Sequence, residues 1–282
     1  MDGDALNFVR MGIRYANKIN AVSPNYAQEL LTPLGSHHLF SEFQKRRSDV
    51  SGILNGCDYS QWDPVNDPHI AKNYHHADLS GKKACKAALQ KELQLPKKMR
   101  VPIIGMVCRL TEQKGFGFIL PMLEKLMQHE VQVAIIGTGD PEISLFLQEV
   151  AKKHPKKLVF VEDFSVRKAH MIEAGSDFFL MPSLFEPCGL NQMYSLAYGT
   201  LPIVRAVGGL KDTVIDLADD PDSATGFMFE QPESSALLSC VQRALLFYHE
   251  APEVVVLTQQ RAMQSRFTWD AAAQDYQTLY LS

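Results

Sequence analysis

The chain has 282 residues, of which 46% are hydrophobic and 21% are charged, and its formal net charge at pH 7 is −4. This composition is typical of a globular protein with one large or two smaller domains. The negative net charge gives no reason to expect nucleic acid or an anionic membrane as a partner. No apolar run of about 18 residues occurs, so no transmembrane helix is predicted, and residues 1–6 lack the features of a signal peptide.

The cysteines and histidines form no recognised disulfide or metal pattern. Five cysteines occur at irregular spacing, without a Cys-x-x-Cys pair. Reduced thiols in a cytoplasmic compartment are the simplest interpretation. The pairs His37-His38 and His75-His76 have carboxylates nearby, but not at the spacing of zinc ligands. We therefore expect no metal ion and no cofactor.

The first 80 residues predict short elements joined by loops. Apolar side chains at helical spacing occur over residues 5–16, and residues 19–22 predict a short strand. Ser23 is a good N-cap for a following helix, with Pro24 at its first position. The remaining expected segments are a helix end and exposed loop over 36–50, a short strand running into a turn over 51–58, and a polar loop with one short helix over 63–80.

From residue 81 onward, helical and strand patterns alternate. The expected strands are 102–107, 131–136, 157–161, 178–181, 201–204 and 226–229. The expected helices are 81–94, 117–128, 142–153, 167–174, one after Leu190, 210–218, and further helices to residue 282. Continuous apolar strands that alternate with helices indicate a parallel sheet covered on both faces. We therefore predict a doubly wound α/β domain over roughly residues 51–262.

Residues 177–199 combine a buried strand with a polar loop. The apolar run Phe178–Met181 predicts the strand, and a helical pattern begins near Leu190. Glu186 therefore lies at the carboxyl end of a strand, where open α/β sheets bind ligands. The helix start offers amides to phosphate, and Gly189 permits close approach to the backbone. Glu186 either accepts hydrogen bonds from a polyhydroxyl ligand or only caps or solubilises the loop.

Two other loops follow predicted strands and contain candidate binding residues. Arg109 and Lys114 lie five residues apart after the first strand of the alternating region. An Arg and a Lys on one loop are suited to phosphate oxygens, but the pattern by itself favours a solvated charged turn. Gly137 and Gly139 form a lone Gly-x-Gly, which is weak, lacks the third glycine of a dinucleotide site and also fits a tight turn.

Seven motifs in chain order resemble bacterial glycogen synthase and plant starch synthase. They are Tyr15–Ser23, Leu54–Trp62, Cys108–Gly115, Phe185–Gln192 (FEPCGLNQ), Tyr198–Val204, Gly208–Thr213 and Phe267–Asp270. The resemblance runs from about residue 7 to the end, and an ordered set of this kind is highly specific. These enzymes are retaining glycosyltransferases of the GT-B fold that use ADP-glucose. The resemblance implies an α/β fold with a GT-B type Rossmann-like domain and a remnant of the N-terminal domain.

The resemblance also implies roles for individual residues. The catalytic candidates are Arg109 and Lys114, which would bind the donor diphosphate, and Glu186, which would orient the donor glucose. The further donor-binding candidates are Asn55 at the domain hinge, Gly137 and Gly139 near the nucleotide, Phe164 on adenine, and Cys188, Gly189, Leu190 and Asn191 along the sugar and distal phosphate. Asn55 also fits a simple turn, and Phe164 a loop aromatic that covers the core. Cys188 has no paired base in the sequence, so we assign it no covalent role.

Three departures from the family pattern are visible. Leu184 replaces a usual Arg, and Ala206-Val207 replaces a common Arg-Thr; both changes are expected to weaken donor affinity without removing a core contact. The family's Lys-x-Gly-Gly-Leu loop belongs to an N-terminal domain that would precede residue 1, and no Lys-x-Gly-Gly occurs in the chain. We therefore expect residues 1–50 to be the last part of the acceptor domain, 51–262 the donor domain, and 263–282 a helix that crosses back to the N-terminal domain.

The implied reaction moves glucose from ADP-glucose to the non-reducing end of an α-1,4-glucan with retention. The chain would be the donor-binding half, with little or no transfer alone. The expected partners are ADP-glucose, a glycogen or starch primer, and a missing N-terminal domain or subunit; the expected compartment is the cytoplasm, or the plastid in a plant. Two alternatives remain: a non-catalytic nucleotide-sugar-binding subunit of a split enzyme, and a GT-B transferase with another donor such as UDP-glucose.

Overall fold

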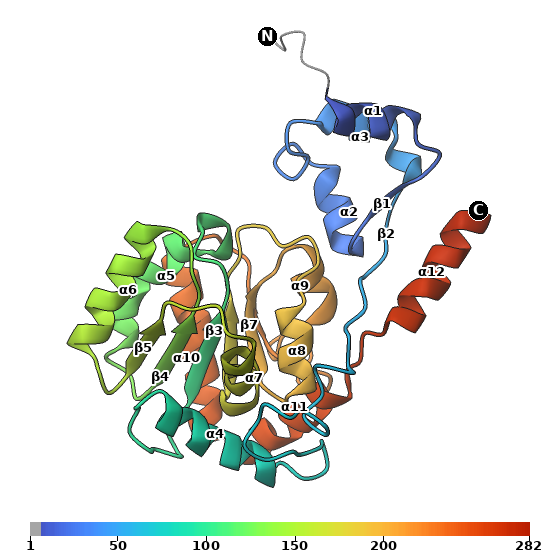
Figure 1. Ribbon diagram of the computed structural model, residues 1–282. Helices are drawn as coiled ribbons and strands as arrows, with labels where there is room; N and C mark the ends of the chain where they lie inside the picture. The colour runs from blue at the N-terminus through green and yellow to red at the C-terminus, as the bar shows by residue number, and fades with distance from the viewer. Residues whose placement is uncertain (1–6) are drawn as a thin grey trace.

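The computed structural model describes residues 7–282, and the expectations for residues 1–6, including the start of the helix expected over 5–16, lie outside this range. A small N-terminal unit lies above a large α/β domain, and the C-terminal helix α12 (Trp269–Leu281) extends back beside that unit (Figure 1). The two chain segments that flank the large domain therefore lie on the same side of it.

From residue 7 onward, the N-terminal unit contains three α-helices, a 3₁₀ turn (Arg47–Asp49) and a two-stranded parallel sheet. Its elements are α1 (Phe8–Tyr15), β1 (Ile19–Ala21), α2 (Pro24–Leu30), α3 (Phe40–Lys45) and β2 (Val50–Gly52). The Ser23 hydroxyl caps α2 by accepting from the Tyr26 amide at 3.3 Å, which confirms the predicted helix start. The loop expected over 36–50 is wrong in part: α3 forms there because Leu39 and Phe43, four residues apart, pack together with Ile13.

The large domain is built on a six-stranded parallel sheet, which confirms the predicted fold class. The strands are β3 (Ile103–Val107), β4 (Gln132–Ile136), β5 (Leu158–Val161), β6 (Phe178–Met181), β7 (Leu201–Arg205) and β8 (Phe227–Phe229). Their order is β5-β4-β3-β6-β7-β8, so the chain builds outward in one direction from β3 and then in the other from β6. This is the doubly wound order, and β3 and β6 flank its switch point.

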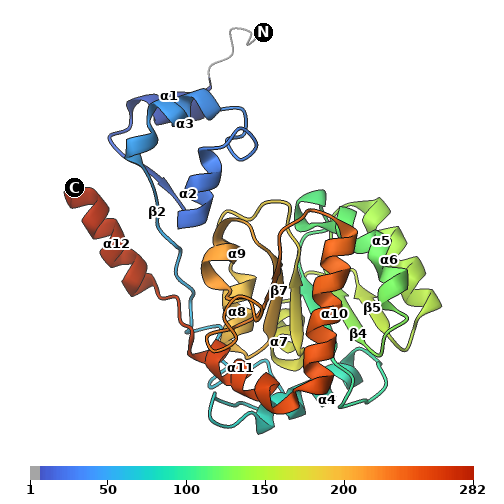
Figure 2. The ribbon, with the colours of Figure 1, turned by 180° about the vertical axis from the view of Figure 1, so that it is seen from behind.

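Helices cover both faces of this sheet (Figure 2). They are α4 (Ser80–Glu92), α5 (Phe116–Leu126), α6 (Pro141–Lys153), α7 (Val166–Gly175), α8 (Asn191–Ala197), α9 (Gly208–Thr213), α10 (Ser234–Glu250) and α11 (Pro252–Gln264). Successive strand residues enter different cores: Phe178 packs with side chains from α5 and α10, whereas Phe179 packs with side chains from α4 and α7. The strands are apolar throughout because both of their faces are buried.

Two expectations for the loops are wrong. The helix expected over 210–218 ends at Thr213, because the Asp216 carboxylate instead receives hydrogen bonds from the Met228 amide and from both terminal nitrogens of Arg243. One short helix was expected over 63–80, but residues 53–79 contain no helix and α4 begins only at Ser80. The side chain of Asp67 holds this long segment on the domain by bonding to His170 Nδ1 at 2.8 Å.

The N-terminal unit contacts the loops at the carboxyl end of the sheet. Ser23 Oγ donates to the Pro187 carbonyl at 2.6 Å, and the Gly208 amide donates to Glu29 Oε1 at 2.7 Å. The unit is also linked to α12, because Asn20 Nδ2 donates to the Tyr276 hydroxyl at 3.0 Å. The loop that contains Glu186 is therefore held from above by residues of the N-terminal unit.

Candidate functional site

A cavity of about 340 Å³ opens at the carboxyl ends of β3 and β6. These strands are neighbours in the sheet, with Ile104 opposite Phe178 in the register. The cavity therefore lies at the switch point, where doubly wound sheets bind ligands. Eight of the eleven candidate residues line it: Arg109, Lys114, Gly137, Phe164, Glu186, Gly189, Leu190 and Asn191. Asn55, Gly139 and Cys188 do not line it.

A short ion pair occupies the centre of the site. Lys114 Nζ lies 2.6 Å from Glu186 Oε2, and Ser183 Oγ donates to the same oxygen at 2.9 Å. Glu186 is only 7% exposed, so it does not solubilise the loop. Both of these polar contacts go to Oε2, which fixes the carboxylate while its second oxygen keeps its own acceptor capacity.

Arg109 is exposed at the mouth of the cavity, directly after β3, and forms no salt bridge within the described part of the chain. Lys114 is placed by a 3₁₀ turn, Glu112–Lys114, which ends at Gly115. Gly115 has φ +83°, and a Cβ there would lie 2.1 Å from the Pro182 carbonyl oxygen. A glycine is therefore required to bring the lysine loop against the loop of Glu186.

The two loops are also joined through Gln113. Its side-chain amide donates to the Phe185 carbonyl at 3.1 Å, and its own carbonyl accepts from the Leu184 amide at 2.8 Å. Leu184, where the family usually has Arg, is 40% exposed. Its backbone rather than its side chain makes this contact, so the departure leaves the join between the loops intact.

Gly137 and Gly139 allow two strand-end loops to touch. A Cβ on Gly137 would lie 2.0 Å from the Cys108 carbonyl oxygen, and one on Gly139 would lie 2.4 Å from that of Leu110. Gly139 also has φ +156°. The tight-turn alternative therefore accounts for Gly139, which faces the neighbouring backbone, whereas Gly137 both packs tightly and lines the cavity.

Phe164 lies at the rim and is 87% exposed. The alternative in which it covers the core does not fit a ring with so much free surface. An exposed aromatic face beside a cavity is suited to stacking on a flat ligand.

The Cys188 side chain is buried, and neither Cys188 nor Asn55 lines the cavity. The Cys188 side chain is buried in an apolar cluster with Cys57 and Met193, and the chain turns immediately afterwards at Gly189, where φ is +74°. Burial raises the pKa of the Cys188 thiol, and a hydrogen bond with the backbone of Asn55 partly offsets this effect. A buried thiol with a raised pKa is not a nucleophile. Neither residue lines the cavity, so their expected donor contacts stay predictions.

Several cavity residues were not among the candidates, among them Trp62, Glu173 and Ser183. Trp62 is stacked between the rings of His170 and Tyr194, with centroid distances of 3.8 and 4.1 Å. The motif that contains Trp62 was recognised. Trp62 is far in sequence from the other cavity residues, so the sequence did not predict that it lines the cavity. Glu173 is 1% exposed, and burial raises its pKa well above the ordinary value. An acid within a helix pattern gives no signal that it will be buried.

Across residues 7–282, no cluster of three or more His, Cys, Asp or Glu side chains is arranged to hold a metal ion. Within the same residues, no helix is long and apolar enough to cross a membrane. Arg109 and Lys114 are the basic residues among those that line the cavity.

The doubly wound parallel sheet, with a cavity at its switch point, is the architecture of a GT-B glycosyltransferase domain. Residues 90–251 match the family model described as "Glycosyl transferases group 1", and the chain belongs to this family. Residues 2–43 match the model described as "Starch synthase catalytic domain".

The relatives are glycogen synthases. The chain is 55% identical over 280 residues to glycogen synthase of Vibrio cholerae, covering 98% of the chain and 58% of the relative. It is 54% identical over 275 residues to that of Aeromonas hydrophila, covering 98% and 56%. These matches confirm the predicted resemblance. The chain spans little more than half the length of the curated relatives it matches.

The fold has a clear counterpart among solved structures. The catalytic domain of starch synthase IV from Arabidopsis thaliana, bound to ADP and acarbose, superposes with a TM-score of 0.93 at 33% identity. The superposition covers 99% of the chain and 58% of that structure. The agreement extends over the N-terminal unit and α12 as well as the six-stranded domain.

Proposed function

We propose that the chain is the donor-binding half of a glycogen or starch synthase that uses ADP-glucose. The proposed reaction transfers glucose to the non-reducing end of an α-1,4-glucan and retains the anomeric configuration. The placement of Arg109, Lys114 and Glu186 on one cavity at the switch point carries the proposal. The identity to glycogen synthases and the likeness to a starch synthase bound to ADP support the choice of donor.

The diphosphate of the donor binds between Arg109 and Lys114. Arg109 presents a planar fork at the mouth, and Lys114 a point charge further inside. Negative charge on the diphosphate grows as the bond to glucose breaks. Cations that are already in place stabilise this charge without reorganisation, so they lower the barrier more than they strengthen ground-state binding.

Glu186 orients the glucose. Lys114 and Ser183 hold its Oε2, so the carboxylate keeps its position while the other oxygen accepts hydrogen bonds from sugar hydroxyls. The adenine stacks on Phe164, and the distal phosphate lies along Gly189 and the start of α8. The N-cap of this helix is Leu190, whose side chain makes no capping hydrogen bond. The amides of the first turn are therefore left for the ligand.

The acceptor glucan and part of the glucose contacts belong, in this proposal, to sequence that the longer relatives have and this chain does not include. The chain alone binds ADP or ADP-glucose and transfers little or no glucose. The five cysteines are free, and reduced thiols support a cytoplasmic location. No observation favours a different donor or a purely structural subunit.

The test is ADP binding by calorimetry, with Arg109→Ala compared with Arg47→Ala. Arg47 is also exposed but lies in the N-terminal unit and does not line the cavity. We expect Arg109→Ala to weaken ADP binding about 10- to 100-fold, since a charge-assisted contact contributes about 1.5–3 kcal/mol. The control should stay within about twofold. Equal affinity for ADP in both variants would contradict the assignment of Arg109 to the diphosphate. Tighter binding of UDP than of ADP would contradict ADP-glucose as the donor.

A further inference from the structure

A second cavity, of about 740 Å³, lies at the opposite end of the strands from the donor site, where β3 and β6 begin. It is bordered by Met99 and Arg100 before β3, and by Ser176 and Asp177 before β6. We call it the amino-edge cavity. Helix α4 forms one wall, and the end of α10 with the start of α11 forms the other. The length of β3 separates it from the donor site, about 16 Å for five residues.

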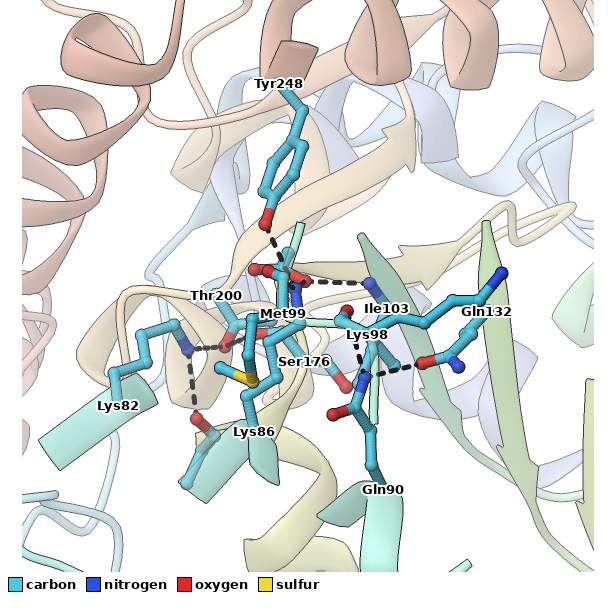
Figure 3. Close-up of polar contacts among 12 residues, drawn as sticks. Lys82, Lys86, Gln90, Lys98, Met99, Ile103, Gln132, Ser176, Thr200 and Tyr248 are labelled. Carbon is cyan, nitrogen blue, oxygen red and sulfur yellow. Dashed lines mark hydrogen bonds and ion pairs between the residues drawn. The ribbon is translucent and has the colours of Figure 1, made fainter. Parts of the chain in front are cut away.

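One of its lysines is a structural anchor. Lys86 Nζ lies 2.7 Å from Asp177 Oδ2, and it also donates to the Tyr248 hydroxyl at 3.0 Å and to the Met99 carbonyl at 3.2 Å (Figure 3). These contacts use all three of its N–H donors. The Lys86–Asp177 pair is neutral as a unit and leaves nothing for a ligand.

Three further cations line the same cavity without a counter-charge. Lys82, Lys83 and Arg100 form no salt bridge within residues 7–282. With Lys86 and Asp177 included, the lining has four positive groups and one negative group, a formal charge of +3 with His249 counted as neutral. Uncompensated positive charge in a concave, partly desolvated space attracts anions.

Lys82 is the deepest of the three. It is 6% exposed, and its Nζ donates to Thr200 Oγ1 at 2.6 Å and to the Ala174 carbonyl at 3.2 Å (Figure 3). These two acceptors leave one of its three N–H donors for a ligand. Burial lowers the pKa of Lys82 to about 8. A bound anion would favour the charged ammonium and offset this desolvation.

The opposite wall is apolar. Pro252, Val255 and Val256 of α11 face the lysines of α4 across the cavity, and Leu79, the N-cap residue of α4, adds an apolar side chain on the lysine side. The volume falls in the range of small-molecule pockets, about 300–1,000 Å³. An inorganic ion would leave most of this space and the apolar wall unused, whereas an organic anion would fill both.

We propose that the amino-edge cavity binds a small organic phosphate monoester. The phosphate contacts Lys82, Lys83 and Arg100, and the organic body packs against α11. Arg100 supplies the planar fork and the two lysines supply point charges, a combination suited to a dianion. The site is separate from the donor cavity and does not depend on the proposed reaction.

The test uses calorimetry at constant ionic strength, with inorganic phosphate and glycerol 3-phosphate as probes. Lys83→Glu/Arg100→Glu changes exposed residues at the rim. Lys152→Glu/Lys156→Glu makes the same change in net charge at exposed positions outside either cavity. A third variant, Arg109→Ala/Lys114→Ala, removes the phosphate-binding side chains of the donor site.

We expect glycerol 3-phosphate to bind more tightly than inorganic phosphate. The rim variant should weaken binding about tenfold or more, while the charge control and the donor-site variant stay within about twofold. Three results would overturn the proposal: no saturable binding of either probe, loss of binding only in the donor-site variant, or equal weakening in both glutamate variants. Equal affinity for inorganic phosphate and glycerol 3-phosphate would contradict the proposal that an organic group packs against α11.

Discussion

The Lys114–Glu186 pair makes a sharp prediction, because the two residues have opposite effects on a diphosphate. In the free protein Lys114 Nζ lies 2.6 Å from Glu186 Oε2, and the two side chains are 19% and 10% exposed. A diphosphate must compete with Glu186 for Lys114 and also approaches the carboxylate's own negative charge. We therefore expect Glu186→Gln to tighten the binding of ADP, although it removes a residue of the site.

The magnitude follows from the geometry. Two unit charges about 4 Å apart interact by about 4 kcal/mol at an effective dielectric constant near 20, and exposure and salt reduce this figure. A gain of about 1–2 kcal/mol, or about 5- to 30-fold in affinity for ADP, is the expected net effect. ADP-glucose should gain less than ADP, because the amide replaces the carboxylate that accepts from the sugar hydroxyls.

The assay is titration calorimetry of ADP and ADP-glucose with the Gln variant and with Glu112→Gln. Glu112 is an exposed acid on the lysine loop that does not line the cavity, so its loss tests the general effect of one negative charge. ADP affinity that falls in Glu186→Gln, with thermal unfolding unchanged, would refute the competition between ligand and carboxylate. A gain of the same size in both variants would show only a nonspecific charge effect.

Three further predictions concern single side chains. Phe164→Ala should weaken ADP binding by about 1–3 kcal/mol and leave urea unfolding unchanged, since the ring is 87% exposed; unchanged affinity would exclude stacking. Asp177→Asn should lower the free energy of unfolding by about 3–5 kcal/mol, because Lys86 is left buried and unpaired. The double variant Asp177→Asn/Lys86→Met should lose less stability in urea unfolding, and equal losses in the two variants would argue against the ion pair as the cause. Burial raises the pKa of Glu173, so folding favours its protonated form, and the stability it contributes at low pH is lost as pH rises from the ordinary carboxyl pKa toward the raised value. Glu173→Gln should therefore stabilise the protein more at pH 8 than at pH 4 in urea unfolding, and a pH-independent difference would contradict the raised pKa.

The sequence by itself determined the order of elements in the large domain. Apolar runs such as Phe178–Met181 predict buried strands because a parallel sheet covered on both faces has no polar side. Ser23 and Pro24 predict a helix start because capping is a local interaction. The motifs located Arg109, Lys114 and Glu186 on strand-end loops, and strand ends in a parallel sheet meet at one edge.

Only the tertiary structure decided which loop side chains share the cavity. Cys188 is next to Gly189 in sequence, yet its side chain is buried in an apolar cluster. Gly139 does not line the cavity, and the backbone of Leu110 leaves no room for a Cβ there. Glu173 gives no sign in sequence that it lines the site.

The amino-edge cavity was also invisible in sequence, for the same reason. Lys82 and Lys83 lie in an ordinary basic helix pattern, and their wall partners Val255 and Val256 lie more than 170 residues away in the chain. Local periodicity records which face of an element is apolar. It does not record which distant element covers that face, and burial, charge compensation and cavity shape all depend on that packing.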